Sequence, residues 1–350
     1  MVYKEDIYAE RGQNMQENFW QRTEENGKRT DLAAEKTEIY REKTAQKGEI
    51  DGIKTQTDEC GGIKITRVYV LDERGERALA KNRGTYITIE SDSLEYNDTE
   101  QYRHVCTALK EELGRVCSPD LSKPVLIVGL GNKNITADSL GPKVVEQMLV
   151  TRHLFENMPE LTDEQTASVC AIAPGVLGIT GIETAEIVKG VAQRVKPGLI
   201  IVIDALAARR VWRVNTTVQI SDTGISPGSG VGNHRKALDK ETLGTQVVAI
   251  GVPTVVDAAT MAYDTLDMTM NAIRSEAKDM PDFMKMLDEM DGEQMYSLIK
   301  ETTGPSLGGM VMTPKEVDTA MNKISKIIAN GINIFLQNGM TIEEIESFTV

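Results

Sequence analysis

Two short stretches decide the fold of this chain, Pro124-Val-Leu-Ile-Val128 and Leu199-Ile-Ile-Val-Ile203. Each is an apolar run bounded by Gly or Pro, a pattern typical of a buried strand in a parallel sheet. The first run leads through Gly129-Leu-Gly131-Asn132 to Asp138, and Asp204 follows the second run at once. Residues beyond the carboxyl ends of such strands line the ligand crevice of open α/β sheets. Two carboxylates in one crevice can act as an acid/base pair, so a hydrolase is the leading hypothesis.

The segments on either side of these runs predict an α/β fold. Further strands are predicted over 63–71, 84–90, 169–173, 214–220 and 245–252, with helices over 98–116, 142–153, 180–195, from Thr254, over 261–300 and from 313 to about 337. Capping boxes are predicted at Thr180–Glu183 and Thr313–Glu316, and a turn at Asp72–Gly75. We expect a three-layer α/β/α sandwich with a mostly parallel sheet, an N-terminal strand region and a Met-rich helical insertion.

The ends of the chain and its Met-rich part each allow two interpretations. Residues 1–29 are polar and lack periodicity, which indicates a frayed tail, with a removable pro-segment as the functional alternative. Residues 261–300 hold eight of the 16 methionines. Such a stripe is more often adaptable core or a subunit interface than a cofactor site.

Composition narrows the class of protein. The 350 residues are 40% hydrophobic, which supports a sizeable core. The net charge of −14, from 53 acidic and 39 basic residues, argues against direct binding of nucleic acid. No apolar run approaches the ~18 residues of a membrane span, and the N-terminus lacks the apolar region of a secretory signal.

Cysteine and histidine give no sign of a metal site or a disulfide framework. The four cysteines, Cys60, Cys106, Cys117 and Cys170, contain no C-x-x-C pair and indicate reduced thiols in the cytoplasm. The three histidines have no metal-ligand spacing. We therefore predict no metal and no cofactor.

Two glycine motifs were weighed as alternatives. Gly129-Leu-Gly131 after a strand lacks the third glycine of a dinucleotide site, because Asn134 stands there, so NAD is rejected. The pair instead predicts a tight loop that folds Asp138 back toward the sheet. Gly224-Ile-Ser226-Pro-Gly228 matches a nucleophile elbow, which keeps a serine hydrolase as the runner-up. The glycines at 228, 230 and 232 indicate either a surface loop or a substrate-binding lip.

Several segments together resemble the germination protease (spore protease) of endospore-forming bacteria. They are Arg29–Glu35, Gly129–Asn132 with Asp138–Pro142, Pro174–Thr184, Ile203–Arg209 with Gly228–Asn233, and Thr313–Asp318. Each segment alone is a weak signal, but their order and spacing are specific and extend over nearly the whole chain. One departure is Ala137, where the family often has Pro before the first aspartate.

The resemblance implies an atypical aspartic endopeptidase related in fold to hydrogenase-maturation endopeptidases. Its substrates would be the small acid-soluble proteins that coat spore DNA, degraded during germination in the spore core. The family's two essential aspartates match Asp138 and Asp204. The resemblance further implies a homotetramer made as an inactive zymogen.

The resemblance also gives the N-terminal region a chemical interpretation. Family substrates are cut after an acidic residue in T-E-(I/F)-A-like sites, and Thr30-Asp-Leu-Ala33 imitates such a site. We therefore predict autoprocessing between Asp31 and Leu32, with Thr37-Glu-Ile39 ranked lower. The predicted organisation is a pro-segment over 1–31 and one α/β peptidase domain over 32–350, with a helical insertion over 261–312.

The mechanism expected from the two aspartates is water-mediated peptide hydrolysis. One carboxylate stays ionised and activates water, while the other is protonated and assists the carbonyl or the leaving amine. The structural alternatives are that Asp138 caps the following helix and that Asp204 is a strand-end turn residue. A non-enzymatic α/β protein that docks partners through the Met-rich segment is the remaining alternative.

Overall fold

The structure, a computed structural model, describes residues 30–44, 48–91, 99–162, 166–226, 236–276, 301–302 and 310–349. The chain divides into two compact units. The larger comprises residues 30–256 and 311–350, and the smaller comprises 1–29 and 257–310. The predictions for residues 1–29 and for most of the Met-rich segment after residue 276 fall outside the described residues.

The described part of the smaller unit is mainly the helix α10 (Ala258–Glu276). It confirms helical structure at the start of the Met-rich segment. The helix begins at Ala258 and not at the predicted Thr254, because the preceding strand β8 continues to Asp257. The Asp257 carboxylate accepts hydrogen bonds from the backbone N–H (3.0 Å) and hydroxyl (3.1 Å) of Thr260, which satisfies a free donor at the helix start.

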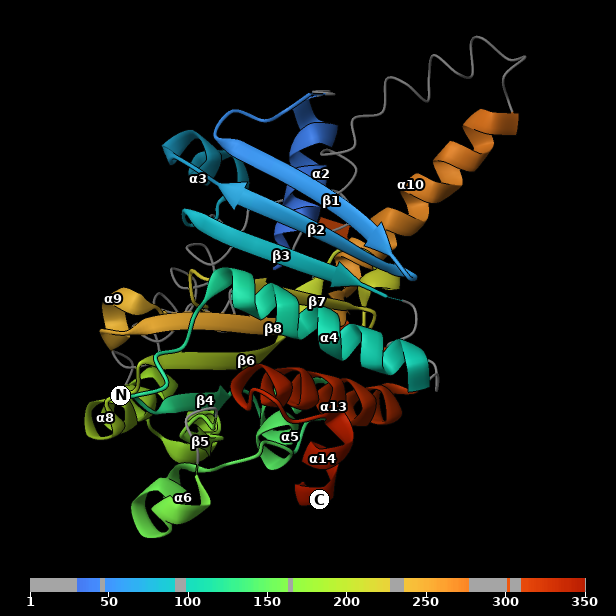
Figure 1. Cartoon of the computed structure of the whole chain (residues 1–350). Coiled ribbons are helices and arrows are strands. Elements are labelled where there is room, and N and C mark those ends of the chain that lie inside the picture. Colours follow the sequence, from blue (N-terminus) through green and yellow to red (C-terminus); the bar gives the residue numbers. More distant parts are fainter. Residues whose placement is uncertain are drawn as a thin grey trace, which may run out of the picture. The chain divides into compact units, whose positions relative to one another are not determined.

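The larger unit contains a nine-stranded sheet in the order β1-β2-β3-β7-β8-β6-β4-β5, with β9 paired to β8, among the described residues (Figure 1). The strands are β1 (Ile53–Cys60), β2 (Ile63–Val70), β3 (Gly84–Glu90), β4 (Val125–Gly129), β5 (Val169–Ile172), β6 (Leu199–Ala208), β7 (Thr217–Ser221), β8 (Gln246–Asp257) and β9 (Val311–Met312). The strands β5, β4, β6 and β8 run parallel, whereas β1, β2, β3, β7 and β8 pair antiparallel.

The α/β class is therefore confirmed, but the prediction of a mostly parallel sheet is wrong. The sheet is mixed because its first strands are joined too tightly for parallel pairing. Only Gly61 and Gly62 connect β1 to β2, and both have positive φ. Such a two-residue hairpin can join only antiparallel strands, whereas a parallel pair needs a crossover.

Helices cover both faces of the sheet and complete the three-layer sandwich. They are α2 (Ala33–Thr44), α3 (Glu73–Leu79), α4 (Thr99–Val116), α5 (Leu140–Glu146), α6 (Arg152–Asn157), α7 (Leu177–Thr180), α8 (Thr184–Val195), α9 (Lys240–Leu243), α13 (Val317–Leu336) and α14 (Ile342–Phe348), with short 3-10 turns η2 (Thr136–Asp138), η3 (Pro159–Leu161) and η4 (Val211–Arg213). Helices α4, α5 and α13 pack on one face, and α2, α3 and α8 pack on the other. Among the described residues no helix is long and apolar enough to cross a bilayer.

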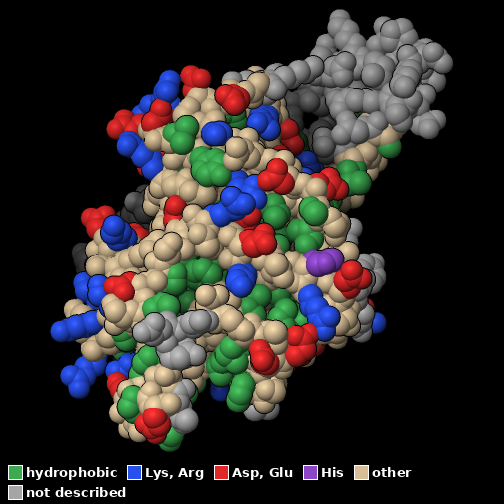
Figure 2. Space-filling view, viewed as in Figure 1, with side chains coloured by type: hydrophobic (Ala, Val, Ile, Leu, Met, Phe, Trp, Pro, Cys, Tyr) green, Lys and Arg blue, Asp and Glu red, His purple; other side chains and the backbone are tan. Residues whose placement is uncertain are grey.

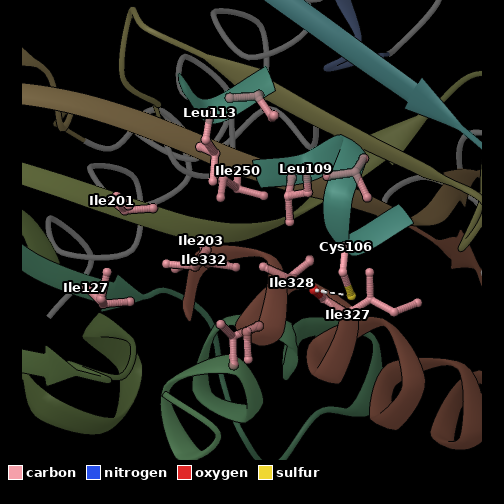
Figure 3. Packing of buried hydrophobic residues seen from close by; sticks show 14 of the residues in the cluster. Cys106, Leu109, Leu113, Ile127, Ile201, Ile203, Ile250, Ile327, Ile328 and Ile332 are labelled. Atoms are coloured by element: carbon pink, nitrogen blue, oxygen red, sulfur yellow. Dashed lines mark hydrogen bonds between the residues drawn. The ribbon is translucent and has the colours of Figure 1, made fainter. Parts of the chain in front are cut away.

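The main core lies between the sheet and the pair α4 and α13 (Figure 3). The predicted stripe of α4 is buried through Val105, Leu109 and Leu113, and it meets Ile328 of α13. Each buried side chain of this size contributes about 1.5–3 kcal/mol. A Cβ on Gly331 would lie 2.5 Å from Leu109 Cδ2, so glycine is needed there to let the two helices approach.

Three local predictions near the N-terminal half are wrong. Residues 72–75 are not a turn, because the Asp72 carboxylate accepts the backbone N–H groups of Arg74 (2.8 Å) and Gly75 (3.3 Å) and thereby caps α3. Strand β1 was not predicted at all. The helix predicted over 142–153 is shorter, because α5 ends at Glu146 and α6 starts separately at Arg152.

Both predicted capping boxes are also wrong. Helix α8 begins at Thr184 and α13 at Val317, in each case without a side-chain cap. The Thr313 hydroxyl instead donates to the Thr254 carbonyl at 2.8 Å, which ties the start of this segment to β8. A capping box does form between Thr341 and Glu344, where it opens α14. A capping-box pattern in the sequence does not ensure the cap, because the threonine hydroxyl can form a tertiary hydrogen bond instead, as that of Thr313 does.

The acidic net charge is not gathered into one patch on the face shown in Figure 2. Acidic and basic side chains are interspersed there, with apolar side chains between them. A field of mixed sign favours solubility and gives no single strong attraction for a charged polymer.

Candidate active site

The first predicted aspartate lies in a loop that folds back onto the end of β4. Asp138 is the last residue of η2, and its Oδ2 accepts the backbone N–H of Asn132 at 2.8 Å. Gly131 has a φ of +108°, and a Cβ there would lie 2.1 Å from the Asp138 carbonyl oxygen. The loop therefore has the tight geometry predicted for it, and this position needs glycine.

Two further glycines bring the backbone segments around this loop into direct contact. A Cβ on Gly129 would lie 2.2 Å from the Gly141 carbonyl oxygen, and one on Gly141 would lie 2.3 Å from the Leu130 carbonyl oxygen. The end of β4 and the start of α5 are thus packed backbone against backbone. This contact fixes where Asp138 stands relative to the sheet.

The second predicted aspartate was expected just past the end of its strand. It lies within the strand. Asp204 pairs with Gly251 of β8, and β6 continues to Ala208 because β8 also runs on beside it. Asp204 is 6% exposed, and its Oδ1 accepts the backbone N–H of Ala205 at 3.0 Å. By the alternation of a strand, its side chain shares a face with Ile200 and Val202.

The structure brings the segments that carry the two aspartates to neighbouring places on the sheet. The backbone N–H of Leu130 donates to the Ile203 carbonyl at 2.8 Å, directly before Asp204. The Thr254 hydroxyl of β8 donates to the Ala137 carbonyl at 2.6 Å, directly before Asp138. Strand β6 lies between β4 and β8. Asp138 is therefore tied to both neighbours of the strand that carries Asp204.

The helix-capping alternative for Asp138 is wrong. The residue before α5 is Ser139, which makes no side-chain cap hydrogen bond, and the Asp138 carboxylate turns instead to Asn132. The alternative of a strand-end turn for Asp204 is also wrong, since the residue is paired on β6.

The predicted processing site is held firmly against the same strand. The Asp31 backbone N–H donates to the Ala207 carbonyl at 2.9 Å, and the Ala207 N–H donates to Asp31 Oδ2 at 2.9 Å. The Asp31 carbonyl accepts from Lys81 Nζ (2.8 Å) and Gln219 Nε2 (3.2 Å). Leu32 is 0% exposed. The bond between Asp31 and Leu32 thus joins a half-buried residue to a buried one, and Asp31 is held at Ala207, three residues along β6 from Asp204.

A buried glutamate that sequence reasoning missed anchors the segment after this bond. The Glu35 carboxylate is 0% exposed and accepts the backbone N–H groups of Arg209 (2.7 Å) and Arg210 (2.9 Å) as well as the Thr30 hydroxyl. Arg213 lies 3.4 Å away. Burial raises the pKa of Glu35, although these partners act to lower it. No local pattern marks a helical glutamate as buried, since its distant partners come from the bend after β6 and from η4.

The other predicted site residues are less informative. Gly228, Gly230 and Gly232 lie outside the described residues. Ser226 is exposed, and β7 ends at Ser221, five residues earlier, so no strand runs directly into it as a nucleophile elbow requires. Within the described ranges no group of three or more His, Cys, Asp or Glu residues could hold a metal ion.

Two of the four thiols, those of Cys106 and Cys117, have the environment of core residues. Burial raises the pKa of Cys106 and of Cys117 to about 12. A thiol with such a pKa is a poor nucleophile near neutral pH. These two cysteines are therefore not candidates for catalysis.

Comparison with known proteins places the chain in a family. A family model described as germination protease matches residues 30–282 and 275–349. The germination protease of Clostridium tetani is 51% identical over 320 residues, which cover 91% of this chain and 98% of that protein. Those of Clostridium acetobutylicum and Bacillus subtilis are 49% and 42% identical, over 92% and 91% of this chain and 99% and 96% of each relative.

An α/β sandwich with acidic side chains at the parallel part of its sheet is a framework suited to hydrolysis, and the family match gives the class as a peptidase. The chain belongs to the germination protease family. This membership supports an endopeptidase that acts in spore germination. It also disfavours the non-enzymatic alternative.

Proposed function

We propose that this endopeptidase hydrolyses peptide bonds with Asp138 and Asp204 as its water-activating pair. The observation that carries the proposal is the double attachment of the Asp138 segment, to the loop after β4 through Asn132 and to β8 through Thr254, where β4 and β8 are the neighbours of the strand that holds Asp204.

The substrates proposed are the small acid-soluble proteins that coat spore DNA, cut after an acidic residue in T-E-(I/F)-A-like sites. Support comes from the family, whose curated relatives are named germination proteases. The homotetramer and the location in the spore core are proposed on the same ground. Light scattering on the purified full chain tests the tetramer, since a monomer at micromolar concentration would contradict it.

In this mechanism one carboxylate of the pair is ionised and takes a proton from the attacking water. The other is protonated, donates a hydrogen bond to the scissile carbonyl oxygen and then protonates the leaving amine. Two neighbouring carboxylates resist double ionisation, so their titrations are coupled and belong to the pair. The rate is therefore expected to follow a bell-shaped pH profile.

The test of the pair is the replacement of each aspartate by asparagine, which keeps the shape and removes the charge. We expect Asp138→Asn and Asp204→Asn each to lower kcat at least 10²-fold on a T-E-I-A peptide, as for loss of a general acid or base. Asp120→Asn is the matched control, because the Asp120 carboxylate also accepts a backbone N–H, that of Ser122 at 3.1 Å, but is exposed. A Tm near that of the parent chain shows that each variant folds. Activity above a tenth of the parent's in either variant removes that residue from the mechanism.

We further propose that residues 1–31 form a pro-segment that is removed by a cut between Asp31 and Leu32. Because Leu32 is buried and Asp31 is hydrogen-bonded, residues around this bond must leave Ala207 and Gln219 before they can be cleaved. The alternative bond after Glu38 lies inside α2, so a turn of helix would have to unwind first. Mass spectrometry after mild acidification tests the cut, with Leu32 expected as the new N-terminus. Full activity with an intact N-terminus would defeat the zymogen proposal.

A further inference from the structure

We propose that Lys81, Lys36 and the Ala207 backbone N–H form an acid-binding subsite, which selects the acidic residue of a substrate's cleavage site once Asp31 has left. The inference rests on the proposed function, in that it takes cleavage at acidic sites as given. It adds the residues that read the acid. Asp31 fills this subsite in the intact chain.

The contacts of Asp31 are those expected of a bound acidic peptide. Its carboxylate accepts the Ala207 N–H at 2.9 Å, and its own N–H donates to the Ala207 carbonyl at 2.9 Å. The side chain and the main chain of one residue are thus held by a single residue of β6. A backbone N–H that meets a carboxylate makes a charge-assisted hydrogen bond, which is stronger than a neutral one.

The Gln219 side chain forms hydrogen bonds with the main chain on both sides of Leu32. Its Nε2 donates to the Asp31 carbonyl at 3.2 Å, and its Oε1 accepts the Ala33 N–H at 2.7 Å. The carboxamide therefore brackets Leu32 as a neighbouring strand would. Ala33 stays with the enzyme after the proposed cut, so the contact that an incoming peptide can take over is the one from Gln219 Nε2 to a main-chain carbonyl.

Two lysines supply the positive charge. Lys81 Nζ donates to the Asp31 carbonyl at 2.8 Å, and Lys36 Nζ donates to the Ala80 carbonyl at 3.2 Å, one residue away along the chain. Burial lowers the pKa of both lysines, that of Lys36 to about 8, while the charge of Asp31 acts to raise it. The mutual repulsion of the two lysines adds to the lowering at Lys36.

Removal of Asp31 would leave these two ammonium groups close together without its counter-charge. Lys36 lies beyond the proposed cut and stays with the enzyme, as does Lys81. An incoming carboxylate restores the attraction that Asp31 gave, whereas a neutral amide of the same shape does not. The subsite therefore distinguishes charge and not only shape.

The subsite lies on the strand that carries one residue of the proposed catalytic pair. Ala207 and Asp204 belong to the same strand and are separated by three residue steps, about 10 Å at the rise of a strand. A substrate that places its acid at Ala207 therefore binds along the strand that carries Asp204.

The test compares two peptides that differ in one group, a T-E-I-A substrate and the same peptide with Gln for Glu. The full chain is first processed, and its N-terminus is confirmed by mass spectrometry. We expect the parent enzyme to prefer Glu, and Lys81→Met to lower the ratio of kcat/KM for Glu over Gln at least 10-fold. Lys81→Arg should restore most of the preference, because it keeps the positive charge. Lys36→Met should change the ratio in the same direction.

Several outcomes separate this inference from the proposed function. Both peptides are assayed with the same enzyme preparation, so the ratio of kcat/KM for Glu over Gln is insensitive to partial unfolding. The control variant is Lys123→Met, which replaces an exposed lysine and should leave this ratio unchanged. In any variant that cleaves neither peptide, equilibrium titration measures the preference instead, as the ratio of the two dissociation constants. An unchanged ratio in both Lys81→Met and Lys36→Met overturns the subsite. Failure of the parent enzyme to cleave either peptide instead contradicts the proposed function.

Discussion

Replacement of Gly131 by alanine is the sharpest test of how the loop geometry supports the site. The new Cβ would stand 2.1 Å from the Asp138 carbonyl oxygen and 3.0 Å from Asp138 Oδ1. Non-bonded carbon and oxygen atoms need more than ~3 Å, so Asp138 must move by roughly an ångström. The hydrogen bond from the Asn132 N–H to Asp138 Oδ2 would be distorted as a result.

The magnitude follows from two contributions. A φ of +108° is sparsely populated by residues other than glycine and costs about 1–3 kcal/mol. Forcing an extra methyl into packed backbone costs about 1–3 kcal/mol more. We therefore expect Gly131→Ala to lower the free energy of unfolding by about 2–6 kcal/mol. A misplacement of about 1 Å in a catalytic group costs about 10²-fold in rate, so kcat on a T-E-I-A peptide should fall at least that far.

Two other glycines separate the causes. Gly181 has a φ of +70° but nothing within 4 Å of an added Cβ, so Gly181→Ala isolates the backbone strain. Gly190 is in α8, has no positive φ and also has open space, so Gly190→Ala should be neutral or slightly stabilising. Urea unfolding and peptide cleavage are measured on all three. If Gly131→Ala keeps kcat within threefold of the parent and unfolds like Gly181→Ala, the crowding argument is wrong.

Two predictions concern buried charges. Glu112 is 1% exposed and accepts Arg67 Nε and Nη2 at 2.7 and 2.6 Å, so Glu112→Ala should cost about 3–5 kcal/mol by leaving Arg67 poorly compensated; a loss below 1 kcal/mol in urea unfolding would contradict this. The pKa of Glu35 is raised in the folded chain, so folding favours its protonated form. Its contribution to stability is complete below the ordinary value of 4.5 and is lost as pH rises through the raised pKa. The Tm of the parent minus that of Glu35→Gln should therefore fall as pH rises from about 4.5 to 8, and a flat or rising difference in thermal unfolding would refute it.

The sequence predicted the elements whose signal is local. Strand β4 and helix α4 were found because each is buried on a face that its own residues define. Strand β1 was missed, since only its first residue, Ile53, is buried and the rest is polar. Its identity as a strand comes from pairing along the whole of β2, which no local pattern reveals.

The candidate site shows the same division. Asp138 was found because glycines and an acid follow a strand at short range. Lys81, Gln219 and Glu35 were not found, because each acquires its role from a partner that is distant in the sequence, 50 residues away for Lys81, 186 for Gln219 and 174 for Glu35. A hydrogen-bonding side chain has no sequence signature until the fold supplies its partner. The family resemblance carried the prediction of the processing site, and the contacts of that segment came only with the structure.

Processing after Asp31 would change the site locally, because the helix that follows is anchored independently of the cut. Glu35, Glu38 and Glu42 are spaced i, i+3 and i+7, so they share one face of α2. Glu38 pairs with Arg213 at 2.7 Å and Glu42 with Arg209 at 2.9 Å.

All three glutamates therefore hold α2 to the bend after β6 and to η4, and none of them leaves with residues 1–31. These ion pairs are partly or fully buried, so they are weakly screened by solvent. They are formed by residues that remain after the pro-segment is removed. If residues 1–31 are removed as proposed, we expect the strand that carries Asp204 to keep its position, while the places on Ala207, Lys81 and Gln219 that Asp31 occupied become available. The proposed activation would then empty one subsite and would need no rearrangement of the sheet.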